Sequence, residues 1–240
     1  MAQNDNKIVP MQQSAARAAA DAADVKRRAL LQHDIFNLVC LSLVVGMDAE
    51  YLWSTADEWG KLGTTDIIGP SHLLKFHVCT AFFLVYLFAD CLWIWAVPGC
   101  TSASPSTIIV HHAICAINFC LPLYDARWAW FAVVIRSAEA NTIVLLLRRL
   151  SPLGSLTYRA LDALFYATWL AFRLVLFPVM TYVLWDEYVR FSAAAGTFVN
   201  VVAVGPAMQA LLTAMSYGWT YELLAKGMKK KAGKEKNKAL

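Results

Sequence analysis

Apolar residues occur along most of this chain in long, unbroken runs separated by short polar segments. The runs cover residues of about 35–53, 72–96, 106–123, 128–147, 159–185 and 195–224. A helix that crosses the ~30 Å hydrocarbon core of a bilayer needs about 20 such residues, whereas the strands of a membrane barrel are shorter and alternate apolar with polar positions. The pattern therefore predicts an all-α, polytopic membrane protein built as a bundle of six transmembrane helices.

Composition agrees with a membrane protein. Hydrophobic residues make up 59% of the chain and charged residues only 16%, whereas soluble domains are about half apolar and a quarter charged. The pattern predicts an Ala-rich N-terminal segment (1–33), a membrane domain (34–228) and a basic tail (229–240). We expect the N-terminal segment to form a frayed helix at the membrane surface. Within the fifth run, Pro178 removes a backbone donor and is expected to kink the helix.

The basic residues are distributed unevenly. With six spans, most of the 21 Lys and Arg residues fall in segments that share one side of the membrane with the two termini. The positive-inside rule then predicts that both termini are cytosolic. Because this charge accounts for orientation in the membrane, we expect no nucleic-acid partner.

The extreme C-terminus resembles a sorting signal. Lys236 and Lys238 stand fifth and third from the end, as in the KxKxx retrieval signal of endoplasmic-reticulum membrane proteins. The resemblance implies an endoplasmic-reticulum location, with coat-protein contact through these two lysines on the cytosolic side.

The cysteines do not predict a disulfide framework or a metal site. Five of the six lie inside apolar runs and none has a CxxC spacing, so we interpret them as small apolar packing residues. They are Cys40, Cys79, Cys91, Cys100, Cys115 and Cys120. His111 and His112 are adjacent, and adjacent helix positions converge poorly on one ion, so no metal is predicted.

Ionisable residues inside the runs are the strongest functional signal, because a charge in lipid costs about 2.5–3.5 kcal/mol or more. At 1.5 Å per residue, Asp90 and the His111–His112 pair lie at one level, roughly 8–9 Å from the cytosolic ends of their helices. Arg136 and Glu139 lie deeper, on one face at i, i+3 spacing. Asn118, Thr142 and Arg173 are the other polar residues placed in this region. If all face inward, they line a polar cavity that opens toward the cytosol.

Each of these residues also has a structural interpretation. Arg136 and Glu139 could simply neutralise each other. Asp90 could serve only to fix the tautomer and orientation of a histidine.

Four segments resemble, in order, the motifs of the TLC domain family. They are "VYLFADCLW", "IIVHHAICAI", "RSAEANTIVLLLRR" and "FYATWLAFRLVLFPV". The family has an Asp in an early helix, a His-His pair, a Glu followed three residues later by Thr, and a helix with Arg and Phe-Pro. These match Asp90, His111 with His112, Glu139 with Thr142, and Arg173 with Phe177-Pro178. The resemblance covers residues of about 34–230.

The chain departs from the ceramide synthases of that family. Their His-His motif continues to further His and Asp residues before the Glu, but here the positions before Glu139 are apolar or Arg136. The block around Glu139 is more similar to the small TLC domain-containing proteins linked to lipid homeostasis, although Ile143 stands where those often carry Pro.

Three functions remain open from the sequence. The first is binding or sensing of a membrane lipid or acyl chain, with lipid homeostasis as the role; the lipid contacts would be Asn118, Arg136, Glu139, Thr142 and Arg173. The second is acyl-CoA-dependent N-acyl transfer, with His111 or His112 as nucleophile or general base and Asp90 stabilising the imidazolium. Acyl-CoA would be a co-substrate, and no bound cofactor is predicted. The third is protein trafficking, which the short loops disfavour.

Overall fold

The computed structural model describes residues 5–56 and 70–238 of the chain. Within these residues, six helical segments are long and apolar enough to cross a membrane, so the predicted all-α, six-span architecture is confirmed. The spans are Arg17–Ser54, His72–Ala96, Pro105–Tyr124, Ala129–Leu150, Leu156–Ala195 and Val201–Met228. Most of the loop between the first two spans lies outside the described residues.

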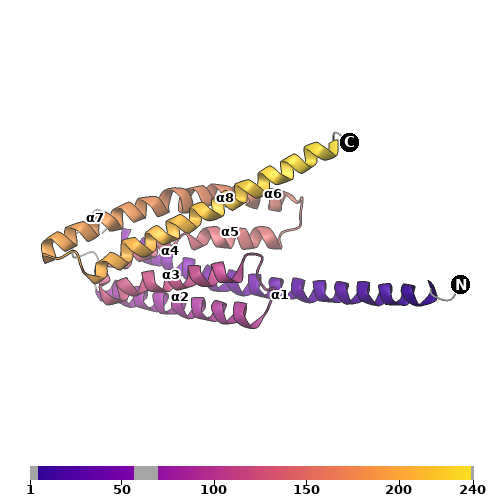
Figure 1. Cartoon of the computed structure of the whole chain (residues 1–240). Coiled ribbons are helices and arrows are strands. Elements are labelled where there is room, and N and C mark those ends of the chain that lie inside the picture. The colour runs from indigo at the N-terminus through magenta and orange to yellow at the C-terminus, as the bar shows by residue number, and fades with distance from the viewer. Residues whose placement is uncertain (1–4, 57–69, 239–240) are drawn as a thin grey trace.

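The elements run in chain order through the bundle (Figure 1). They are α1 (Asp5–Ser54), α2 (Pro70–Ala96), α3 (Pro105–Tyr124), η2 (Ala126–Trp128), α4 (Ala129–Arg136), α5 (Glu139–Leu150), α6 (Leu156–Thr168), the π-helix η3 (Trp169–Leu176), α7 (Phe177–Ala195), η4 (Val201–Ala203) and α8 (Val204–Lys238).

The six spans close into a ring. Helix α1 packs against α2 and α5, α3 packs against α2 and α8, and the ring is completed by α5 against α6 and α7 against α8. Both ends of the chain project from the same end of the bundle (Figure 1), as an even number of spans requires. The connections α2–α3 and α5–α6 lie at this end as well (Figure 1).

Helix α1 is continuous from Asp5 to Ser54. The Ala-rich sequence predicted a separate, frayed helix at the membrane surface. The N-terminal segment instead extends the first span as part of one helix. Ala, Lys and Arg are strong helix formers, and the segment has no glycine and its only proline is Pro10, so nothing interrupts the helix before the membrane. The boundary at residues 33 and 34 remains a prediction, and it falls within this helix.

The fourth span is interrupted in its middle. Helix α4 ends at Arg136 and α5 begins at Glu139. Between them the amide of Ala138 donates to the carbonyl of Ile135 at 3.2 Å, which is the tighter i→i−3 pattern, and Ser137 Oγ donates to the carbonyl of Val134 at 2.6 Å. Such a tight turn within a helix commonly marks a functional hinge or local strain.

The fifth span contains a wider turn before Pro178. Residues Trp169–Leu176 form the π-helix η3, and the Phe177 amide donates to the carbonyl of Phe172, five residues earlier. Pro178 then occupies the first turn of α7, where its missing N–H costs least. The irregularity expected at this proline therefore takes the form of π turns preceding it. Gly196, with φ of +68°, ends α7, so the sixth span begins at Val201 and not near residue 195.

Candidate functional site

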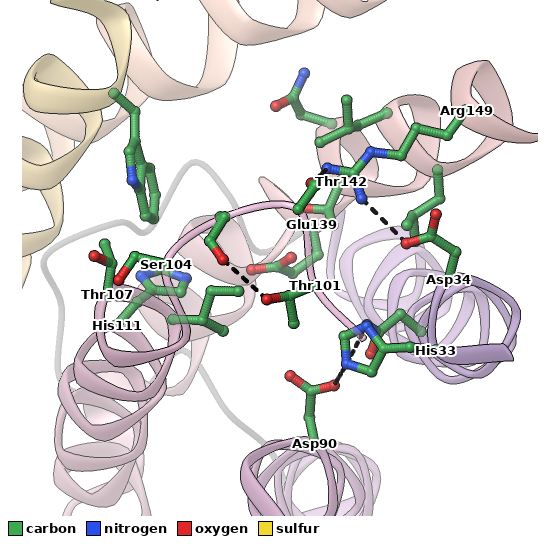
Figure 2. A pocket seen from close by; sticks show the side chains of 18 of the residues that line it. His33, Asp34, Asp90, Thr101, Ser104, Thr107, His111, Glu139, Thr142 and Arg149 are labelled. Atoms are coloured by element: carbon green, nitrogen blue, oxygen red, sulfur yellow. Dashed lines mark hydrogen bonds and ion pairs between the residues drawn. The ribbon is translucent and has the colours of Figure 1, made fainter. Parts of the chain in front are cut away.

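A cavity of about 470 Å³ lies within the ring of helices (Figure 2). Side chains from all six spans line it, and the connection from Thr101 to Ser104 borders it at the end that carries both termini. Six of the residues selected from the sequence line the cavity: Asp90, His111, His112, Glu139, Thr142 and Arg173. The lining extends from His33 to Lys226, so the cavity combines segments that are up to 193 residues apart in the chain.

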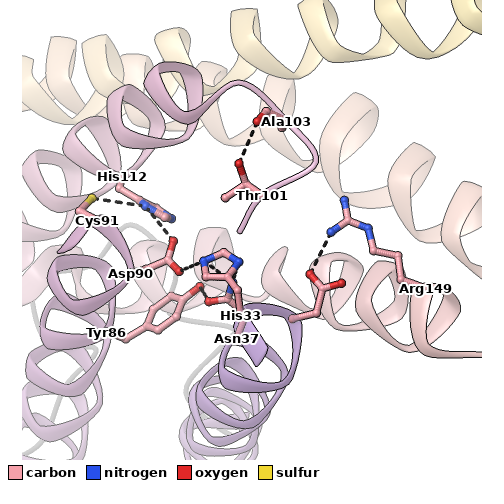
Figure 3. A network of polar contacts seen from close by, with 10 residues as sticks. His33, Asn37, Tyr86, Asp90, Cys91, Thr101, Ala103, His112 and Arg149 are labelled. Atoms are coloured by element: carbon pink, nitrogen blue, oxygen red, sulfur yellow. Dashed lines mark hydrogen bonds and ion pairs between the residues drawn. The ribbon is translucent and has the colours of Figure 1, made fainter. Parts of the chain in front are cut away.

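Asp90 on α2 lies between two histidines (Figure 3). Its Oδ1 is 2.7 Å from Nε2 of His33 on α1, and its Oδ2 is 3.5 Å from Nδ1 of His112 on α3. The Asp90 residue is 1% exposed, so its carboxylate depends on these partners for solvation. Asn37 and Tyr86 extend the network, since the Tyr86 hydroxyl donates to Asn37 Oδ1 at 3.0 Å and Asn37 Nδ2 lies 3.3 Å from the His33 ring nitrogens.

This network favours one tautomer of His112. A proton on Nδ1 can point toward the Asp90 carboxylate, and Nε2 then keeps its lone pair. His112 is 8% exposed and lines the cavity. The contact with Asp90 therefore orients the His112 ring, and its Nε2 has a free lone pair beside an enclosed space. This is the arrangement needed for accepting a proton or attacking an acyl group.

His111 has a different environment from its neighbour. Its ring packs edge-on against Trp219 of α8, with ring centroids 5.3 Å apart, and lies 3.7 Å from Cys115 Sγ through Nε2. No carboxylate lies within ion-pair distance of it among the described residues. The two adjacent histidines therefore differ in role: His112 is coupled to an acid, whereas His111 forms part of the wall between α3 and α8.

Glu139 and Arg173 face each other deeper in the cavity. Glu139 Oε1 and Arg173 Nη2 are 4.0 Å apart, at the limit for an ion pair. The Arg173 side chain is 5% exposed, and its guanidinium lies 5.0 Å from the centre of the Phe177 ring. Its Nε is buried without a hydrogen-bond partner among the described residues. This loosely matched pair is the part of the cavity with unused hydrogen-bonding capacity.

Arg136 and Asn118 do not line the cavity among the residues described. Arg136 does not pair with Glu139, as the i, i+3 spacing suggested, but with Asp48 of α1, with Nη2–Oδ1 at 2.5 Å and Nε–Oδ2 at 2.9 Å. A bidentate carboxylate on another helix satisfies the planar guanidinium better than a single contact along one helix. The prediction that Arg136 and Asn118 line this cavity is therefore wrong, because both are buried elsewhere in the bundle; their contact with a lipid remains a prediction.

Polar contacts also cross the mouth of the cavity. Arg149 of α5 reaches Asp34 of α1 at 3.1 Å (Figure 2). It also donates to the Ser102 hydroxyl at 2.5 Å. Arg148, also in the lining, pairs with Asp162 of α6 at 2.9 Å. These contacts link the α2–α3 connection to α1 and the fourth span to the fifth.

Three polar residues were not predicted from the sequence: His33 and Asn37, which line the cavity, and Asp48, which pairs with Arg136 outside it. Asp48 stands inside the first apolar run, and the cost of a charge in lipid was itself a signal that it needs a buried cation. His33 and Asn37 have i, i+4 spacing and therefore share a helix face, but His33 lay at the edge of the predicted soluble segment. Within residues 5–56 and 70–238, no three His, Cys, Asp or Glu side chains form a group suited to a metal ion.

Comparison with known proteins agrees with this architecture. The family model for the TLC domain, named for TRAM, LAG1 and CLN8, matches residues 31–225. No curated protein and no solved structure gives a significant match to the chain. The matched region begins just before His33, contains four spans entirely and most of the first and the sixth, and includes every cavity-lining residue up to Leu223. The chain belongs to the TLC-domain family.

Proposed function

We propose that this polytopic membrane protein binds a membrane lipid through its acyl chain and headgroup in the cavity between the six spans, and serves lipid homeostasis by doing so. Proteins of the TLC-domain family are linked to lipid metabolism. The observation that carries the proposal is the cavity of about 470 Å³, which has polar groups at Glu139 and Arg173 and apolar or aromatic groups along one wall. Such a mixture is typical of a ligand pocket.

The wall suits an acyl chain. Phe165 and Trp169 line the cavity from the fifth span, and Trp219 and Leu223 line it from α8. Trp169 Nε1 donates to Thr220 Oγ1 at 2.9 Å, which holds that indole in place. Burial of each methylene against such a wall contributes about 0.8 kcal/mol, so a long chain supplies most of the binding free energy.

Lipid extraction and mass spectrometry of the purified protein test this proposal. Leu145 lines the cavity, and Leu145→Trp fills it with a larger side chain. The matched control is Val199→Trp, because Val199 is 92% exposed in the α7–η4 connection. We expect a defined lipid to co-purify with the wild type and the control, and its amount to fall at least tenfold in Leu145→Trp. Equal amounts in both variants, each with a cooperative melting transition, contradict the proposal.

Acyl transfer is the second candidate, favoured by the contact between Asp90 and His112. In this reaction His112 Nε2 attacks the carbonyl of an acyl-CoA thioester, and the CoA thiolate leaves. The amine of a long-chain base then attacks the acyl-imidazole, giving an amide and one proton and regenerating His112. Purified protein supplied with acyl-CoA and long-chain amines should form an amide that His112→Ala abolishes and His111→Phe retains in part. Absence of amide with every amine in a chain-length series rejects it.

The C-terminal lysines are the basis for a proposed cellular location. We infer an endoplasmic-reticulum membrane location with both termini in the cytosol, where coat proteins bind Lys236 and Lys238. Residues 239 and 240 of this signal lie outside the described residues. Replacing both lysines by serine should move a tagged protein to later secretory compartments, whereas replacing Lys229 and Lys230 should not; identical distributions contradict the signal.

A further inference from the structure

The Glu139–Arg173 pair differs from the other arginine pairs that face the interior. Arg136, Arg148 and Arg149 have carboxylate partners at 2.5, 2.9 and 3.1 Å. Arg173 is separated from Glu139 by 4.0 Å, and its buried Nε lacks a partner among the described residues. An unsatisfied buried donor carries an uncompensated desolvation cost. A ligand that accepts a hydrogen bond at this position removes that cost.

The Glu139 carboxylate has spare capacity too. Within the described residues, no hydrogen bond reaches its oxygens, and its side chain is 14% exposed in a residue that lines the cavity. The two side chains therefore present a guanidinium donor and a carboxylate acceptor to the same cavity, with Arg173 Nη2 4.0 Å from Glu139 Oε1. The charges of Glu139 and Arg173 balance each other, but the two side chains still have hydrogen-bonding groups available to a ligand.

This balance selects the charge of the ligand. A phosphate or sulfonate that entered beside the pair would bring an extra charge into a buried site, and the desolvation of that charge opposes binding. A neutral headgroup that both accepts and donates leaves the net charge unchanged. It takes a hydrogen bond from Arg173 and gives one to Glu139.

Building on the proposed function, we propose that the Arg173–Glu139 pair binds the carboxyl group of a long-chain carboxylic acid, taken up in its neutral form. One carboxyl oxygen accepts from the guanidinium of Arg173, which lines the cavity, and the acid proton lies between the ligand and Glu139. The two carboxyl groups then share one proton, as two acids in close contact do. The carboxyl group is preferred to an amide or an alcohol because its proton can move onto Glu139. That movement gives the guanidinium a full carboxylate, and charge-assisted hydrogen bonds are roughly twice as strong as neutral ones.

A competition experiment in nanodiscs tests the headgroup. Radiolabelled hexadecanoic acid is bound to the full-length protein and displaced by hexadecanamide, hexadecanol, methyl hexadecanoate or hexadecanesulfonate. The acid should bind best, the amide and the alcohol more weakly. The ester, which cannot donate, and the sulfonate, which is a permanent anion, should each bind at least tenfold more weakly than the acid. A sulfonate or ester as effective as the acid overturns the proposal.

Variants then test the residues. Arg173→Met should weaken binding of the acid at least tenfold, and Arg173→Lys should restore part of it. Arg190→Met is the matched control, because that arginine is 64% exposed in the last turns of α7 and lies outside the cavity. Melting curves show whether each variant is folded, and the competitor series on the wild type needs no variant at all. Unchanged acid binding in a folded Arg173→Met variant contradicts the inference.

The outcome also separates this inference from the proposed function. If a lipid without a carboxyl group co-purifies and is lost in Leu145→Trp, the cavity binds lipid but the headgroup is wrongly assigned. If neither a co-purified lipid nor acid binding is detected, both the cavity function and the headgroup assignment are rejected.

Discussion

Two arginine–carboxylate pairs lie on either side of the interruption at Ser137–Ala138, and they are built differently. Arg136 reaches Asp48 through two nitrogens, donates to Thr80 Oγ1 at 3.0 Å, and lies 5.5 Å from the ring centres of both Phe83 and Phe119. Both members of the pair are fully enclosed, with side chains 0% and 1% exposed. This site is closed: all of its strong contacts are within the protein.

The second pair is open. Arg173 and Glu139 belong to a cavity, stand 4.0 Å apart, and leave the Arg173 Nε without a partner among the described residues. The comparison teaches that the same two residue types in one bundle can serve opposite purposes. A pair that satisfies itself stabilises the fold, whereas a pair that is held apart keeps hydrogen-bonding capacity for a ligand.

The largest expected effect is on the closed pair. Arg136→Met leaves Asp48 buried as an unpaired charge, which should lower the free energy of unfolding by about 3–5 kcal/mol. Thermal or SDS-induced unfolding in detergent measures this. The control is the double variant Asp48→Leu with Arg136→Met, which removes both charges and should recover much of the loss. A double variant no more stable than the single one would show that the site is not held by the pair.

Asp90 provides a test of intermediate size, because its two partners are imidazoles and not a guanidinium. His33→Phe removes the contact at 2.7 Å and leaves only His112 at 3.5 Å. Loss of one partner from a buried acceptor should cost about 1–3 kcal/mol, measured by the same unfolding assay. His33→Gln retains a donor and should lose less. If the two variants unfold alike, the hydrogen bond to Asp90 does not contribute to stability.

Arg173→Met should have a smaller effect on stability than Arg136→Met. The two side chains of this pair are 4.0 Å apart and form no hydrogen bond with each other, so the free energy of unfolding without ligand should change by about 1 kcal/mol or less. The substitution removes the buried, unsatisfied Nε, which is stabilising. This gain partly offsets the destabilisation caused by leaving Glu139 without its cationic neighbour. A loss as large as that of Arg136→Met would erase the distinction between closed and open pairs.

The smallest effect belongs to a pair outside the membrane-spanning segments. Arg127 donates to Asp125 at 2.9 Å from Nε, and this hydrogen bond lowers the pKa of Asp125 below its ordinary value of 3.8. A lowered pKa stabilises the fold above pH 3.8, and the contribution is lost as the pH falls through the folded-state pKa. Since Arg127 is 43% exposed, Asp125→Asn should cost less than about 1 kcal/mol at pH 7. The difference from the wild type should shrink toward pH 3, and a difference that grows there contradicts this sign.

The number and approximate limits of the spans could be predicted from the sequence, because the length and apolar composition of a segment are local properties. It did not predict the interruption at Ser137–Ala138 or the π turns before Phe177, since both depend on contacts with other helices. Pro178 indicated irregularity at the right place, although not its form. The sixth span began later than expected because Gly196 ends the preceding helix in a left-handed conformation.

The candidate site was predicted in part. Motif order selected Asp90, His112, Glu139 and Arg173, and the structure brings these residues to one cavity. The pairing of Arg136 was wrong because the spacing rule considered only its own helix. Its true partner is 88 residues earlier in the chain, and a local pattern contains no information about a contact of that kind. The same holds for His33 and Asp90, which are 57 residues apart.

The uninterrupted first helix has a mechanical consequence. With 50 residues it is a rod of about 75 Å, and its N-terminal part projects beyond the bundle (Figure 1). No joint separates this protruding arm from His33, Asp34 and Asp48. The protruding part and the residues that contact the acid network, the cavity mouth and the closed ion pair therefore belong to one continuous helix, so a change in its tilt would displace all three together.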